Sequence, residues 1–121
     1  MCVVLIIEDD RETNEAIVSA LATESYDCVA AYDGLQGLDE LVAQRPDVVL
    51  LDLELPGIQG SELLLRKARL APVAGTPVII ITGLSNPPIL DGTVGMLRKP
   101  FSLEELLSAI DLAKGSEAAA S

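Results

Sequence analysis

Five short apolar runs alternate with amphipathic stretches along almost all of this 121-residue chain. The runs, which we expect to be strands, cover residues 3–7, 28–32, 48–51, 78–81 and 94–97. Most of them are continuously apolar rather than alternating, as parallel strands are when helices cover both faces of their sheet. The sequence therefore predicts an α/β fold with a doubly wound, five-stranded parallel sheet and right-handed crossovers.

The amphipathic stretches are predicted to be helices over about residues 11–25, 33–45, 60–70 and from 102 onward. The last is the clearest, because Ser102 and Glu105 have the spacing of a capping box and Gly115 predicts the helix end. Its expected buried face consists of Leu103, Leu106, Leu107 and Ile110. We expect one domain over residues 1–115, followed by a disordered tail or linker stub over 116–121.

Charge and cysteine content narrow the function classes. With 19 acidic against 8 basic residues the net charge is −11, which argues against direct binding to nucleic acid. Cys2 and Cys28 are too few for a disulfide scaffold, and the chain has no histidine to complete a zinc site, so buried thiols are expected. No apolar run approaches the ~18 residues that span a bilayer. The N-terminus also lacks a secretory signal, and we expect a cytoplasmic protein without membrane insertion.

Polar residues stand where the predicted strands end. Glu8 and Asp9 follow the first strand, Asp52 and Thr82 end the third and fourth, and Lys99 follows the fifth. Taken singly, each is readily explained as a solvated loop residue. Because the carboxyl ends of parallel strands meet at one edge of a sheet, the five together predict a binding or catalytic site there.

The same residues lie in a recognisable series of motifs: "IIEDD", "PDVVLLDLELPGIQG", "VIIITG" and "LRKPF". Asp52 lies 43 positions after Asp9, and Thr82 lies 30 after Asp52. From Val3 to about Ala113 the chain resembles the response-regulator receiver domain of two-component signalling. The resemblance implies a flavodoxin-like sheet with strand order 2-1-3-4-5 and a phosphoacceptor signalling module that switches partner binding.

The resemblance also implies roles for the strand-end residues. Asp52 would accept the phosphoryl group, and Lys99 and Thr82 would contact its oxygens. A Mg²⁺ ion would be bound by Asp9, Asp52 and the backbone carbonyl of Glu54, with Glu8 acting through a bound water. The phosphoryl donor would be a histidine kinase or a histidine phosphotransfer protein. The domain would not be an enzyme beyond catalysing its own phosphorylation and dephosphorylation.

Two features depart from the resembling family. Lys99 lies 47 positions after Asp52, which is fewer than is usual in that family. The missing residues fall between the fourth and fifth strands, where Pro87 and Pro88 interrupt any helix. That helix is therefore expected to be shortened or irregular. Met96 stands where most members carry a tyrosine or phenylalanine that couples the threonine to the output face. We therefore expect the output to depend on residues 84–93 or on the first helix.

Two alternatives stay open at this point. The first is a receiver-like domain that signals by binding without being phosphorylated. The second is a phosphatase of the haloacid dehalogenase type, which also uses a strand-end aspartate and Mg²⁺. Such enzymes place a second aspartate two residues after the nucleophile, where this chain has Glu54. They also carry the nucleophile on their first strand, whereas Asp52 ends the third strand here.

Overall fold

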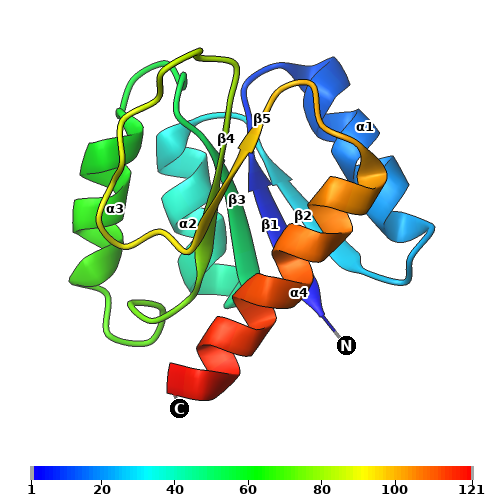
Figure 1. The fold of residues 1–121 in the computed structure, drawn as a ribbon. Coiled ribbons are helices and arrows are strands. Elements are labelled where there is room, and N and C mark those ends of the chain that lie inside the picture. The colour runs from blue at the N-terminus through cyan, green and yellow to red at the C-terminus, as the bar shows by residue number, and fades with distance from the viewer. Residues whose placement is uncertain (1, 121) are drawn as a thin grey trace.

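A computed structural model describes residues 2–120 of the chain and the side chains of residues 2–115. Five parallel strands form one sheet in the order β2-β1-β3-β4-β5 (Figure 1). Their bounds are β1 (Val3–Ile7), β2 (Asp27–Ala31), β3 (Val48–Asp52), β4 (Val78–Thr82) and β5 (Gly95–Arg98). The predicted flavodoxin-like fold class and strand order are confirmed.

Helices cover both faces of the sheet. They are α1 (Arg11–Ala22), α2 (Gly34–Gln44), α3 (Gly60–Ala68) and α4 (Leu103–Ala120). Figure 1 shows α1 and α4 on one face and α2 and α3 on the other. Helices α1 and α2 are slightly shorter than the sequence suggests. A residue with positive φ follows each of them, Ser25 at 67° and Arg45 at 44°, and this conformation does not continue a right-handed helix.

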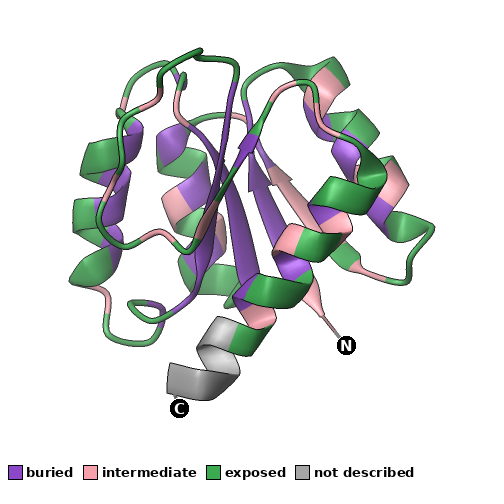
Figure 2. Cartoon of the chain, in the orientation of Figure 1, coloured by how far each residue is buried: buried purple, intermediate pink, exposed green. Residues whose placement is uncertain are grey.

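The sheet separates two apolar cores. Val4 and Ile6 of β1 pack on the side of α1 and α4, whereas Leu5 and Ile7 pack on the side of α2 and α3. The central strands are accordingly buried along their length (Figure 2). This two-sided burial explains why the strands are continuously apolar, since residues of either parity face a core. It also holds the strand ends, and the polar residues that follow them, in a fixed register.

Helix α4 begins as predicted but ends later. The backbone N–H of Ser102 donates to Glu105 Oε1 at 3.1 Å, and that of Glu105 donates to Ser102 Oγ at 3.0 Å, which confirms the capping box. Leu106 and Ile110 are buried as expected, whereas Leu103 is exposed. The predicted stop at Gly115 is wrong, because the helix continues to Ala120 and Gly115 is not among the described glycines with positive φ. Alanines after it favour continuation. That residues 116–121 form a tail or linker stays a prediction.

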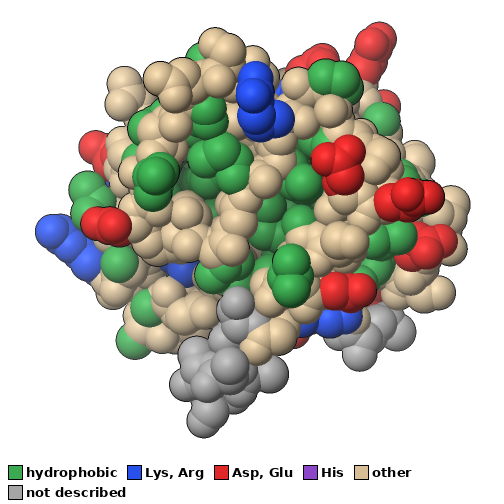
Figure 3. Space-filling view, in the orientation of Figure 1, with side chains coloured by type: hydrophobic (Ala, Val, Ile, Leu, Met, Phe, Trp, Pro, Cys, Tyr) green, Lys and Arg blue, Asp and Glu red, His purple; other side chains and the backbone are tan. Residues whose placement is uncertain are grey.

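No helix forms between β4 and β5. Residues 83–94 run as an irregular loop, in agreement with the interruption expected from Pro87 and Pro88. Large apolar side chains are left exposed in this loop and on β5, including Ile89 at 95% and Met96 at 38%. Met96 is exposed because no helix covers its face of β5. Figure 3 shows hydrophobic side chains gathered on the side of the molecule where this loop and β5 lie.

Within the part of the chain that the structure describes, no helix has the length and apolar character needed to cross a membrane.

Candidate functional site

The carboxyl edge of the sheet gathers the predicted site residues. Glu8 and Asp52 are almost completely buried, with 1% and 2% of their surface exposed, and Thr82 is fully buried at the end of β4. Asp9 is exposed beside them. Lys99 is held next to Thr82, because its backbone N–H donates to the carbonyl of Thr82 at 2.7 Å. The topology thus brings together all five side chains that the sequence placed at strand ends.

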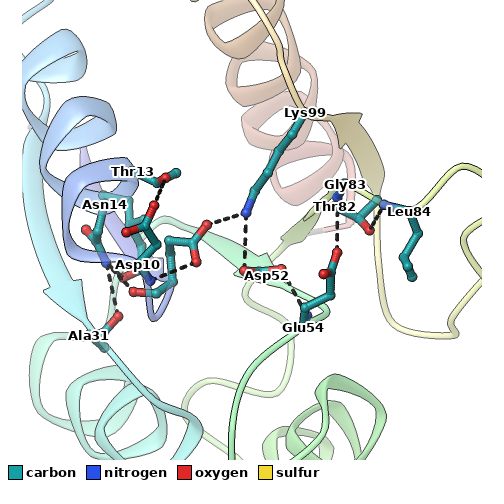
Figure 4. A network of polar contacts seen from close by, with 12 residues as sticks. Asp10, Thr13, Asn14, Ala31, Asp52, Glu54, Thr82, Gly83, Leu84 and Lys99 are labelled. Atoms are coloured by element: carbon teal, nitrogen blue, oxygen red, sulfur yellow. Dashed lines mark hydrogen bonds and ion pairs between the residues drawn. The ribbon is translucent and has the colours of Figure 1, made fainter.

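Lys99 joins two of the carboxylates. Its Nζ lies 3.3 Å from Asp52 Oδ2 and also donates to Glu8 Oε1, so one ammonium group contacts both buried acids (Figure 4). Burial works to lower the pKa of Lys99, but the two carboxylates outweigh it and hold the pKa above its ordinary value. The lysine is therefore a fixed positive charge at the site.

Glu8 has a perturbed pKa. Burial, the largest cause, and the neighbouring Asp52 carboxylate raise the pKa of Glu8 from 4.5 to about 7, against the opposing effects of Lys99 and of the Asp10 N–H. The Asp10 N–H donates to Glu8 Oε2 at 3.2 Å. A single lysine thus only partly compensates the negative charge at this edge.

The acidic cluster has the donor set for a hard divalent cation. Glu8, Asp9 and Asp52 each offer a carboxylate oxygen, and these oxygens lie within 4.8 Å of one another. Oxygen ligands at such spacing suit Mg²⁺, which prefers carboxylates and keeps several waters. The excess negative charge gives a physical reason for binding, because a cation relieves repulsion that Lys99 leaves in place.

Two hydrogen bonds orient the groups around Asp52. The backbone N–H of Glu54 donates to Asp52 Oδ1 at 2.9 Å, and that of Leu84 donates to Thr82 Oγ1 at 3.0 Å. The side chain of Glu54 accepts a hydrogen bond from the Gly83 N–H at 3.2 Å, a contact that the sequence did not reveal (Figure 4). The site therefore includes the first residues of the β4–β5 loop.

Asn14 supports the site and was missed by the sequence analysis. This fully buried side chain of α1 donates from Nδ2 to the carbonyls of Ile6 and Glu8 in the β1 segment and of Ala31 in β2, at 3.2, 3.1 and 3.1 Å. It thereby fixes the turn that carries the acidic residues. The available signal was a polar residue on the apolar stripe of α1, at helical spacing from Ile17.

The sequence of residues 4–111 matches the response regulator receiver domain family. The chain belongs to this family. Its site geometry agrees with membership, since the buried aspartate, the acid pair, the threonine and the lysine occupy one edge of a sheet with order β2-β1-β3-β4-β5. Membership and geometry are consistent with a phosphoacceptor signalling module, and neither alternative considered from the sequence is favoured.

A curated relative supports the same family, and solved structures have the same fold. The response regulator ArlR of Staphylococcus aureus is 37% identical over 117 residues, covering 91% of this chain and 51% of ArlR. The chain therefore spans about half the length of the curated relatives it matches. A receiver domain protein from Clostridium thermocellum has the same fold, with a TM-score of 0.87 over 100% of both chains at 24% identity. The chemotaxis response regulator CheY4 of Vibrio cholerae gives a TM-score of 0.85 at 25% identity, covering 93% of this chain and 98% of its own.

Proposed function

We propose that this receiver domain accepts a phosphoryl group on Asp52. The observation that carries the proposal is the position of the Asp52 carboxylate, which is buried at the sheet edge, 3.3 Å from Lys99 and within reach of two further carboxylates. A buried carboxylate surrounded by more acids is costly unless the site binds cations. Phosphoryl transfer to a carboxylate needs such cations, because they offset the negative charge of the phosphoryl group.

The covalent step is a substitution at phosphorus. One carboxylate oxygen of Asp52 forms the new P–O bond while the P–N bond of a phosphohistidine on the donor protein breaks. The bonding electron pair leaves with the imidazole nitrogen, and Asp52 becomes an acyl phosphate. Lys99 contacts Asp52 already, so its ammonium group is placed to pair with the phosphoryl oxygens. Thr82 Oγ1 is the hydroxyl at the end of the neighbouring strand and would donate to one of them.

Glu8, Asp9 and Asp52 would hold Mg²⁺ together with the backbone carbonyl of Glu54. Bound there, the ion supplies positive charge that reduces repulsion between the carboxylates and the phosphoryl anion. Asp9 is the exposed member of the cluster and the one most accessible to an entering hydrated ion. Glu8 is held by Asp10 and Lys99 and is the least free to move.

A histidine kinase or a histidine phosphotransfer protein would supply the phosphoryl group, and a protein partner would read the phosphorylated state. The domain would turn over no substrate other than its own phosphoryl group. A cytoplasmic location stays a prediction from the sequence.

Intact-mass measurement after incubation with Mg²⁺ and a small acyl phosphate tests the proposal. We expect one phosphoryl group on the wild type and none on Asp52→Asn, which removes the nucleophile while keeping the side-chain shape. A matched control is Asp39→Asn, an exposed aspartate of α2. Equal labelling of Asp52→Asn and wild type would contradict the proposal, as would steady turnover of the donor without a labelled protein.

A further inference from the structure

Glu54 connects the proposed phosphoacceptor to the loop after β4. Its backbone N–H donates to Asp52 Oδ1 at 2.9 Å, and its side-chain Oε1 accepts from the Gly83 N–H at 3.2 Å. Figure 4 shows the Glu54 side chain extending from the segment after β3 to the start of the β4–β5 loop. The roles proposed above use only the backbone carbonyl of this residue, so its side chain has no assigned purpose.

The loop that Glu54 holds has few other polar attachments. Residues 83–93 are all described, and no backbone-to-backbone hydrogen bond ties them to another segment; within the loop, residues 91–92 form a turn and Thr93 Oγ1 donates to the carbonyl of Leu90 at 2.8 Å. Their hydrogen bonds to side chains elsewhere run to Glu54 and Thr82 at the site. Leu90 packs against the core on the side of α2 and α3, whereas Ile89 is almost fully exposed. A segment with so few buried contacts changes its arrangement at low free-energy cost.

The Gly83 N–H and the Asp52 carboxylate lie at the same edge of the sheet, and Glu54 forms hydrogen bonds with both. Gly83 directly follows Thr82 at the carboxyl edge of β4, next to Lys99. In the unphosphorylated domain this N–H already donates to the carboxylate of Glu54, so an anionic oxygen fits at this position. A single N–H serves one strong acceptor at a time, so Glu54 and a phosphoryl oxygen would compete for it. The negative charge of Glu54 also opposes the approach of the phosphoryl anion.

We propose that the Glu54 side chain is a latch that stands in for the phosphoryl group in the unphosphorylated domain. It slows phosphorylation of Asp52, and its displacement from Gly83 changes the arrangement of residues 83–93. Glu54 is exposed, so its side chain can leave the site without disturbing either core. The inference rests on the proposed function of Asp52 and adds a regulatory residue to it. Glu54 acts here as a positioning residue for Gly83.

The rate of labelling by a small acyl phosphate with Mg²⁺ tests the first half of the inference. We expect Glu54→Gln and Glu54→Ala to be labelled faster than wild type, by about tenfold for the alanine variant, because a like charge and a competing acceptor are removed. The matched control is Glu24→Gln, which removes one charge from an exposed residue in the turn after α1. Its rate should equal that of wild type.

The outcomes separate the two proposals. Absence of labelling on Asp52 in every variant would overturn the proposed function, and the latch with it. Labelling of the Glu54 variants at or below the rate of Glu24→Gln would overturn the latch alone.

Backbone amide spectra of the unphosphorylated protein test the second half. Glu54→Ala should shift the amide resonance of Gly83 and of further residues in 83–93, whereas Glu24→Gln should leave them unchanged. Hydrogen exchange at Gly83 should be faster in Glu54→Ala, because its acceptor is lost. An unchanged Gly83 resonance and exchange rate would show that the contact does not hold the loop and would overturn the inference.

Discussion

Lys99 Nζ lies 3.3 Å from Asp52 Oδ2, although 47 residues separate the two in the chain. The contact results from strand order, because β3 and β5 lie on either side of β4. The same ammonium group also contacts Glu8, so one lysine partly compensates two buried carboxylates. The consequences for stability, metal binding and phosphorylation can be measured separately.

Replacing Lys99 should destabilise the metal-free domain. In Lys99→Met the stem keeps most of its length but the charge is lost, which leaves Glu8 and Asp52 buried without a cation. We expect a loss on the order of 2 kcal/mol in the free energy of unfolding without Mg²⁺. Labelling of Asp52 should also slow. Lys114→Met, at a partly exposed lysine of α4 that contacts Asp111 and the Tyr26 ring at the surface, is the matched control. Denaturant titrations that give both variants the same stability would show that the Lys99 contacts contribute nothing.

Asp9 should govern metal binding without supporting the fold. It is exposed and belongs to the acidic cluster, so Asp9→Asn should leave the metal-free melting temperature unchanged or slightly raised. Wild type should gain stability as Mg²⁺ is added, by about 2.7 kcal/mol at a concentration one hundred times the dissociation constant. The variant should gain much less. Equal stabilisation of both proteins in thermal scans would place the ion elsewhere.

Glu8 should make the metal-free domain less stable as the pH rises. Its pKa is raised from 4.5 to about 7 by burial and by Asp52, so its contribution to stability is fully present below pH 4.5 and is lost as the pH rises through 7. Glu8→Gln removes this titration. The stability of the variant relative to wild type should therefore increase between pH 4.5 and 7, by an amount on the order of 3 kcal/mol. Unfolding measured at pH 5 and pH 8 without Mg²⁺ checks this. A difference that does not vary with pH would contradict it.

Asn14 should stabilise both the fold and the acidic turn. Asn14→Ala removes the donor to the carbonyls of Ile6, Glu8 and Ala31, and we expect a loss of about 2 kcal/mol in the free energy of unfolding. Because these carbonyls border the turn with Glu8 and Asp9, Mg²⁺ affinity should fall as well. The control Ser19→Ala changes an exposed residue of the same helix. Retention of wild-type Mg²⁺ affinity in a destabilised Asn14→Ala would limit its role to folding.

Phosphorylation should alter the β4–β5 loop rather than act through Met96. Met96 is 38% exposed and has no aromatic ring to turn inward. Residues 83–93 lack a helix, and their first two backbone N–H groups donate to the side chains of Glu54 and Thr82 at the site. Backbone amide shifts with and without a phosphoryl mimic should therefore change most over residues 83–93. Changes confined to Met96 and α4, with that loop silent, would mean that the usual route of the family is kept.

The sequence alone predicted the strands of the sheet and the members of the candidate site. The run from Val48 to Leu51 is apolar throughout because both faces of the strand are buried, and this pattern is visible without any tertiary information. Glu8, Asp9, Asp52, Thr82 and Lys99 could be named because each ends or follows such a run. The interruption of the helix before β5 could also be predicted from local sequence, because Pro87 and Pro88 cannot sit in a helix interior.

Tertiary structure decided which of these groups touch and which apolar side chains are covered. The contacts of Lys99 with Glu8 and Asp52, and of Glu54 with Gly83, depend on distances between loops that no local pattern encodes. Met96 and Leu103 are apolar yet exposed because burial requires a neighbouring element, and none covers them. Gly115 failed to end α4 because a glycine ends a helix only when its backbone adopts a left-handed conformation, which the residues around it did not impose. Sequence patterns report the preference of a segment, whereas contacts are set by the packing of segments that are distant in the chain.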